Sequence, residues 1–269
     1  MKQVLAVILA LVFSVSAFAH EYWLEPDMFF LKAGEETALR LFVGEGLKKE
    51  EERLFQASKT PLFRRYSHGV GSGIDISANA RDDVSPLMDI LFAKAGSVMF
   101  AMERNWSYIS LEPKEFDQYL REDGMEYIIA EREKRGESGK PGRERYSRFL
   151  KTLVQVGDKT DSTYKKRTGL KLEIIPLDDP YFIAVGNSIL FKVLFEGKPL
   201  REKTIFADAR EGESISKSKF TTDRNGEVSV KIGRRGVWLI RLVFMRRCER
   251  DCGDADWESF WGAFSFGVR

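Results

Sequence analysis

The sequence predicts a mainly β protein made of two β-sandwich domains, with a helical insertion in the first. Many short segments alternate apolar and polar residues with a period of two, which is typical of half-buried strands. In the final third of the chain these segments recur roughly every 10 to 15 residues with turn residues between them, as expected for a sandwich. The composition, with 43% hydrophobic and 12% aromatic residues, is that of a folded globular chain.

The first 19 residues have the pattern of a secretory signal peptide. Lys2 precedes an apolar run at 4–13, and Ala17 and Ala19 form an A-x-A cleavage site. The run is shorter than the roughly 20 apolar residues that span a bilayer, although a retained membrane anchor is the alternative. We therefore expect cleavage after Ala19, a periplasmic location, and a mature chain that is not an integral membrane protein.

The charge balance argues against one broad class of function. The chain has 43 Lys and Arg residues against 41 Asp and Glu residues, a formal net charge of +2. A protein that binds nucleic acid through bulk positive charge carries a much larger excess of basic residues. We therefore expect no nucleic-acid partner.

A helical segment interrupts the strand pattern near the middle of the chain. Pro113 suits a first helical turn, and apolar residues follow at helical spacing to about residue 136. Gly124 weakens this helix, so two shorter helices are an alternative. The turn sequence DRNG at 223–226 predicts a tight connection between two strands. The predicted strands are 37–43, 97–102, 106–111, 170–174, 189–195, 204–207, 227–232 and 236–243.

Two polar segments divide the chain further. Residues 136–145 are Gly-rich and charged, which predicts an exposed, mobile loop. Residues 157–169 lack periodicity, so we place a domain boundary near residue 168. The predicted organisation is a signal peptide at 1–19, an N-terminal β-sandwich domain at 20–168 with its helical insertion at 113–136, and an immunoglobulin-like β-sandwich domain at 169–269.

The cysteines are interpreted from the expected compartment. Cys248 and Cys252 lie in the sequence CERDC, and disulfides form and persist in exported proteins. We expect a local disulfide between them. Metal ligation is the alternative, but a structural zinc site takes four Cys or His ligands. The mature chain has two residues of each kind.

The most specific feature is a histidine at the expected cleavage site. Cleavage after Ala19 would make His20 the first residue, with a free α-amine whose pKa is about 7.7 to 8.0. The amine and the imidazole Nδ1 can close a six-membered chelate suited to Cu(II), Ni(II) or Co(II). His68, in the Gly-rich loop SHGVGSG, is the only other histidine and could add a third nitrogen, as in a histidine brace. A frayed terminus and a solvent-exposed loop histidine are the alternatives.

Other site chemistries have less support. With one histidine at the terminus and both cysteines oxidised, neither an activated serine nor a thiolate has a base. The glycines near His68 lack the Lys and Ser or Thr of a phosphate-binding loop. The acidic group Asp251, Asp254, Asp256 and Glu258 could favour calcium but lacks the spacing of an EF-hand, so we expect a solvated loop.

Several segments carry a family resemblance, namely HEYWLEP at 20–26, 145–157, 175–181, 191–200, 222–226, 236–245 and 256–260. In order and spacing they resemble exported bacterial proteins of unknown function described as the periplasmic component of ABC-type cobalt or nickel transport. The resemblance covers nearly all of the mature chain. It implies an N-terminal metal-binding histidine, carried here onto His20, and an immunoglobulin-like C-terminal domain. Family members often have a histidine where this chain has Phe244, so a ligand from that position would be missing here.

These observations lead to three functional hypotheses. The first, favoured by the resemblance, is a non-enzymatic periplasmic protein that binds nickel or cobalt through His20 and His68 and works with an inner- or outer-membrane metal transporter. The second is a structural or ligand-binding β-sandwich module of the cell envelope that binds no metal, since fold does not decide function. The third is a copper oxygenase with a histidine brace. The sequence leaves the metal, the partner, the oligomeric state and the proximity of the two histidines open.

Overall fold

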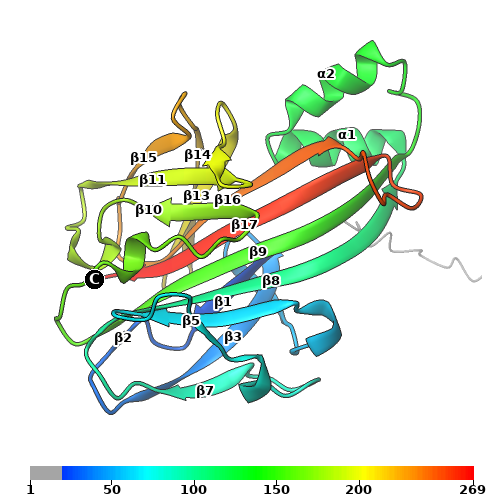
Figure 1. The fold of residues 1–269 in the computed structure, drawn as a ribbon. Coiled ribbons are helices and arrows are strands. Elements are labelled where there is room, and N and C mark those ends of the chain that lie inside the picture. Colours follow the sequence, from blue (N-terminus) through cyan, green and yellow to red (C-terminus); the bar gives the residue numbers. More distant parts are fainter. Residues whose placement is uncertain (1–19) are drawn as a thin grey trace, which may run out of the picture.

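The structure is a computed structural model that describes residues 20–269, so the predicted signal peptide at 1–19 lies outside the described residues. The chain is mainly β, as predicted, with its strands arranged in three sheets (Figure 1). The helical insertion forms the pair α1 (Pro113–Glu122) and α2 (Glu126–Lys134). Gly124 lies between them with a φ of +70°, which explains why one helix becomes two.

A nine-stranded sheet forms the middle of the molecule, with the strand order β14-β13-β16-β17-β9-β8-β5-β6 and with β2 paired to β9. The long strands β8, β9 and β17 run side by side through it (Figure 1). β17 pairs with β9 in parallel, whereas β8 and β16 pair with their neighbours antiparallel. Its strands are β2 (Phe30–Leu31), β5 (Leu62–Ser67), β6 (Ile74–Asp75), β8 (Gly96–Leu111), β9 (Gly142–Val156), β13 (Thr204–Glu211), β14 (Ser214–Thr221), β16 (Gly236–Arg247) and β17 (Trp257–Val268).

Two smaller sheets cover opposite faces of the central sheet. Successive residues of β8 show this, because Met99 packs in the core shared with β10 and β11 whereas Phe100 packs in the core shared with β1 and β3. The two cores are therefore separated by the central sheet. The first small sheet contains β1 (Glu21–Pro26), β3 (Glu36–Glu45), β4 (Lys48–Glu52) and β7 (Met88–Leu91), and the second contains β10 (Leu172–Pro176), β11 (Ser188–Phe195), β12 (Lys198–Pro199) and β15 (Glu227–Lys231).

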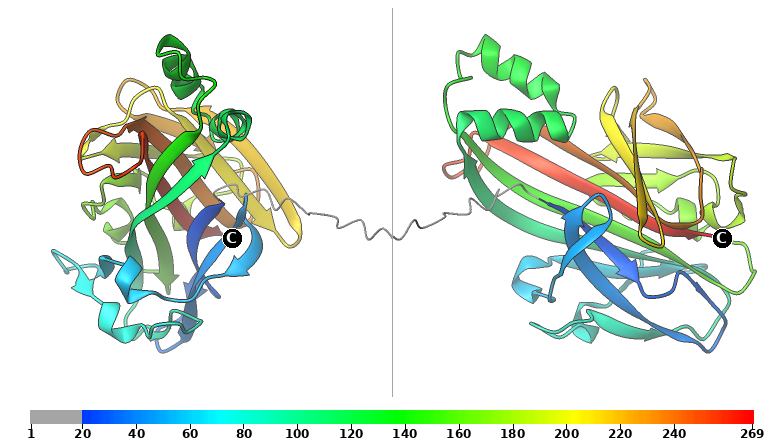
Figure 2. Two further views of the ribbon diagram at one scale, coloured as in Figure 1. Left: turned by 90° about the vertical axis from the view of Figure 1, so that its right-hand side faces the viewer. Right: turned by 180° about the vertical axis from the view of Figure 1, so that it is seen from behind.

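The two helices cover one end of the long strands (Figure 2). Phe116 and Leu120 of α1 are fully buried in a third core, together with Trp257 and Trp261 of β17. Gly142, at the start of β9, lies directly below α1. A Cβ atom added there would lie 2.1 Å from the ring of Phe116. The helical pair is thus packed closely onto the sheet.

The strands on both sides of residue 168 meet in the central sheet, since β9 precedes that position and β17 follows it. Residue 168 itself lies between β9 and β10. The division into an N-terminal sandwich and an immunoglobulin-like sandwich stays a prediction. The predicted mobile loop at 136–145 is too long, because residues 142–145 already belong to β9. Arg145 is only 7% exposed, since Glu258 of the neighbouring strand pairs with it.

Candidate functional site

His20 lies immediately before β1, at a position fixed by two strand pairings. β1 pairs with β3, where Glu21 is opposite Gly44, and β3 turns back into β4. This hairpin brings Glu50 of β4 beside the histidine, and its Oε2 atom lies 3.2 Å from Nε2 of His20. The two side chains are 37% and 34% exposed. The imidazole therefore lies at the surface with one ring nitrogen next to a carboxylate.

His20 borders a cavity of about 280 Å³. Sheet and helix both contribute to it, because β14 and β16 line it together with the end of α1. Lys217 of β14 forms an ion pair with Glu45 at 2.5 Å, and both residues line the cavity. The remaining acidic residues in its wall are Glu21, Glu122 and Asp123. The basic residues in the wall are Lys217, Lys219 and Arg241, so the histidine faces a space with mixed charge.

The floor of this cavity is a buried charge network around Arg241. Its guanidinium group lies 2.8 Å from Glu21, 2.7 Å from Asp208 and 3.3 Å from Asp123. Arg241 itself is 7% exposed and Asp208 is fully buried. Three carboxyl groups therefore share one guanidinium group, which leaves the network short of positive charge.

Burial raises the pKa of two carboxyl groups beside Arg241, those of Asp123 and Glu21. It raises the pKa of Asp123 to about 7, although the positive charge of Arg241 acts in the opposite direction. Burial likewise raises the pKa of Glu21, against the opposing effect of Arg241. Asp123 therefore changes its charge near neutral pH, within the cavity that His20 borders.

The structure does not bring His20 and His68 together. His68 follows β5 and borders a different cavity of about 560 Å³, which includes Lys94 and Asp161. The two cavities have no lining residue in common. Across residues 20–269, moreover, no group of three or more His, Cys, Asp or Glu side chains is arranged to hold a metal ion. A His20–His68 brace therefore has no counterpart in this arrangement of the chain.

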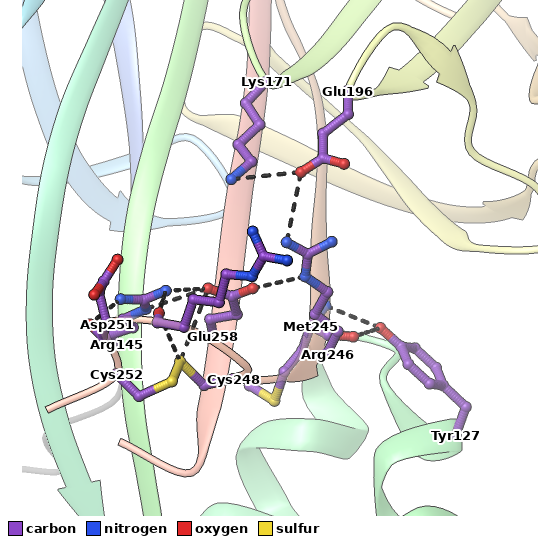
Figure 3. Close-up of polar contacts among 11 residues, drawn as sticks. Tyr127, Arg145, Lys171, Glu196, Met245, Arg246, Cys248, Asp251, Cys252 and Glu258 are labelled. Atoms are coloured by element: carbon purple, nitrogen blue, oxygen red, sulfur yellow. Dashed lines mark hydrogen bonds and ion pairs between the residues drawn. A yellow bond between two sulfur atoms is a disulfide. The ribbon is translucent and has the colours of Figure 1, made fainter. Parts of the chain in front are cut away.

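The predicted disulfide between Cys248 and Cys252 is confirmed (Figure 3). Their Cα atoms lie 5.9 Å apart, which is a usual separation for a disulfide. Arg145 of β9 contacts the loop and donates hydrogen bonds to the carbonyl oxygens of Arg250 and Asp251. The bridge therefore closes a loop that is also attached to the central sheet.

The acidic group near the C-terminus is not wholly a solvated loop, contrary to the prediction. Glu258 belongs to β17, is 3% exposed, and accepts hydrogen bonds from Arg145 and from Nε of Arg246 at 2.6 Å (Figure 3). Burial alone would raise the pKa of Glu258, but these hydrogen bonds outweigh it and lower the pKa. The prediction failed because the arginine partners come from other strands.

Phe244 packs among other aromatic rings. Its ring centroid lies 4.7 Å from that of Phe195 and 6.2 Å from that of Phe260. Phe244 therefore packs against the core beneath the second small sheet and provides no ligand atom.

Neither the contact of Glu50 with His20 nor the network around Arg241 was predicted from the sequence. Glu50 lies in the charged run KKEEER, which has no apolar alternation to indicate a strand. The network could have been predicted in part from Asp208 and Arg241. Each is a single charged residue between apolar residues of a strand, in the sequences FADA and LIRLV. Such charges are buried only when they are paired.

The fold and the site together define a three-sheet β protein in which His20 borders a cavity lined by both acidic and basic side chains. The chain belongs to the family described as domain of unknown function DUF4198, which matches residues 17–246. A comparison with curated proteins gives no match. Within residues 20–269, no helix is long and apolar enough to cross a membrane.

Proposed function

We propose that this chain is an exported, non-enzymatic protein that binds a transition-metal ion, nickel or cobalt, through His20 after signal-peptide cleavage. The metal is cargo rather than a catalytic group. The resemblance of the segment HEYWLEP to periplasmic components of cobalt or nickel transport supports this proposal, as does the A-x-A site before His20. A metal transporter of the cell envelope would be the partner.

The contact between His20 and Glu50 carries the proposal. A carboxylate beside one ring nitrogen is the arrangement that commonly orients a metal-binding histidine and makes its other nitrogen a better ligand. Here the carboxylate lies 3.2 Å from Nε2. This leaves Nδ1, the nitrogen that forms a six-membered chelate with the α-amine of an N-terminal histidine.

The cavity beside His20 supports the same proposal through one carboxylate. Glu21, Glu45 and Asp123 form ion pairs with Arg241 or Lys217, whereas Glu122 lines the same cavity without an ion pair within residues 20–269, and its negative charge favours a cation there. His20 alone supplies the first two ligands, its α-amine and its Nδ1 atom. Such a site is therefore compatible with the absence of a three-residue ligand cluster across residues 20–269.

The test is calorimetric titration of Ni(II), Co(II) and Cu(II) into secreted, correctly processed protein. The same titration is made on a variant with one additional residue before His20, which removes the α-amine from the chelate. We expect tight binding by the processed protein and its loss in the extended variant. Equal affinity in the two proteins, or no binding by either, would refute the proposal.

A second pair of variants tests the role of the carboxylate. Glu50→Gln removes the charge beside Nε2, and Glu51→Gln removes a charge from the next residue, which is 53% exposed and pairs with Arg53 instead. Loss of a supporting carboxylate typically weakens metal binding about 10- to 100-fold. We expect this loss for Glu50→Gln and an unchanged affinity for Glu51→Gln.

A further inference from the structure

Two buried arginines lie directly opposite each other in the central sheet. Arg104 of β8 and Arg148 of β9 are paired in the antiparallel register, and Trp261 of β17 is the next residue in the same row. The arginines are 8% and 7% exposed. Side chains opposite each other on paired strands have Cβ atoms only about 5 Å apart. Two positive charges are thus held close together in a largely dry place.

Neither arginine forms an ion pair within residues 20–269, although the buried carboxyl group of Glu144 is close enough for the charge of Arg148 to lower its pKa. The ion pairs within residues 20–269 include no carboxylate within 4.0 Å of Arg104 or Arg148. Gln56 accepts one hydrogen bond from Nη2 of Arg104 at 2.8 Å. Nη1 of Arg104 and Nε of Arg148 have no hydrogen-bond partner within the same residues. Buried arginines are normally paired, because desolvating a lone charge is costly.

Aromatic rings surround the pair and compensate for only part of this cost. The guanidinium carbon of Arg148 lies 3.9 Å from the ring centroid of Tyr22 and 4.6 Å from that of Tyr146. Arg104 and Arg53 also lie within 6 Å of the Tyr22 ring. Three arginines therefore gather around one tyrosine of β1. Burial lowers the pKa of Arg104, and the charges of Arg148 and Arg53 lower it further.

The strand geometry at this point is also irregular. The pairing of β8 with β9 shifts register between Arg104 and Ser107, so β8 carries a bulge beside the arginine pair. Bulges are frequent next to binding sites, where they redirect a side chain. Tyr22 and Tyr146 are half-buried, so the rings beside the arginines reach the surface of the protein.

We propose that Arg104 and Arg148, with the rings of Tyr22 and Tyr146 around them, form a binding site for a small oxyanion, that is, a phosphate group or a carboxylate. A guanidinium group presents parallel N–H donors that fit the two oxygens of either group. One anion would accept hydrogen bonds from the donors that lack partners and neutralise the repulsion between the two arginines. The site is independent of metal binding at His20.

The test is thermal unfolding of the processed, metal-free protein in sodium phosphate, sodium citrate and sodium chloride at matched ionic strength. We expect phosphate or citrate to raise Tm saturably and chloride to leave it unchanged. A response to phosphate alone identifies a phosphate site, and a response to citrate alone identifies a carboxylate site. No specific increase with either anion would overturn the proposal.

Variants of Arg148 test whether the anion binds at the arginine pair. Arg148→Met removes one of the two repelling charges, so we expect a higher Tm without anion and at least an approximately tenfold weaker anion response. Arg224→Gln removes an exposed charge from a distant turn and should behave as the unchanged protein. If Arg148→Met does not fold, Arg148→Lys keeps the charge but loses the paired donors, and the same loss is expected. An unchanged anion response in the folded Arg148 variant would refute the site.

Discussion

Glu144 of β9 gives the protein a built-in dependence of stability on pH. Its side chain is 1% exposed, and burial raises its pKa from the usual 4.5 to about 7. Tyr119 donates a hydrogen bond to Oε1 at 3.1 Å and Ser259 donates another to the same atom. Both bonds and the positive charge of Arg148 favour the charged form, but they do not offset desolvation, and Oε2 has no hydrogen-bond partner within residues 20–269.

The difference in the pKa of Glu144 between the folded and the unfolded chain sets the sign and size of the change in the free energy of unfolding with pH. Below pH 4.5 the carboxyl group is protonated in both the folded and the unfolded chain. As the pH rises from 4.5 to about 7 the unfolded chain loses this proton first, so the free energy of unfolding falls. Each pH unit between these two pKa values reduces the free energy of unfolding by about 1.4 kcal/mol, so the total loss is about 3 kcal/mol by pH 8.

The variant Glu144→Gln measures this contribution, because glutamine has nearly the shape of the protonated acid and does not titrate. Urea unfolding at pH 4.5, 6, 7 and 8 gives the free energy of unfolding of both proteins. Between the ends of this range, the unsubstituted protein should lose about 3 kcal/mol more than the variant. Asp123 and Glu21 also have pKa values raised by burial and are present in both proteins. Because the charge of Glu144 contributes to the raised pKa of Asp123, the measured difference includes this coupling.

Glu115→Gln is the matched control, because it removes an exposed carboxylate from α1 close by. If Glu144→Gln and the unsubstituted protein showed parallel pH profiles, Glu144 would be charged in the folded protein at pH 6. The reasoning from desolvation would then be wrong.

Three further predictions concern stability. Glu173→Gln removes the charge that lies 3.0 Å from the buried ammonium group of Lys151, and should reduce the urea-derived free energy of unfolding by about 3 to 5 kcal/mol. Replacing both residues with apolar ones should cost much less. Cys248→Ser with Cys252→Ser should cost only about 2 kcal/mol, because the closed loop is short, and a larger loss of Tm than this implies would contradict the loop-entropy argument. Gly142→Ala forces a methyl group into a ring of α1 and should cost about 1 to 3 kcal/mol, measured in the same way.

The sequence predicted the fold class because alternation of apolar residues is a local signal. It anticipated a first strand after His20, which is β1, although β1 is buried on both faces, at Trp23 and Leu24, and it missed β4, which is the charged run KKEEE. Strands buried on both faces or made of charged residues do not show a period of two. It also divided β8 at 97–102 and 106–111, because the bulge after Arg104 breaks the alternation within one continuous strand.

The candidate site was predictable only in part. The expected position of His20, directly after a predicted cleavage site, follows from the residues that precede it. The contact with Glu50 depends on the pairing of β1, β3 and β4, and the network around Arg241 joins residues 21, 123 and 208. Contacts between such distant positions are set by tertiary packing, which leaves no local pattern in the sequence.

The parallel pairing of β9 with β17 has a consequence for how the chain acquires its structure. Glu144 is opposite Trp257, so partners in the middle of the largest sheet are separated by more than one hundred residues of sequence. The central sheet therefore stays incomplete until the last strand of the sequence is available, and folding must await long-range loop closure. Until that strand is available, β9 has an unpaired edge on this side, which is a surface that chaperones can bind.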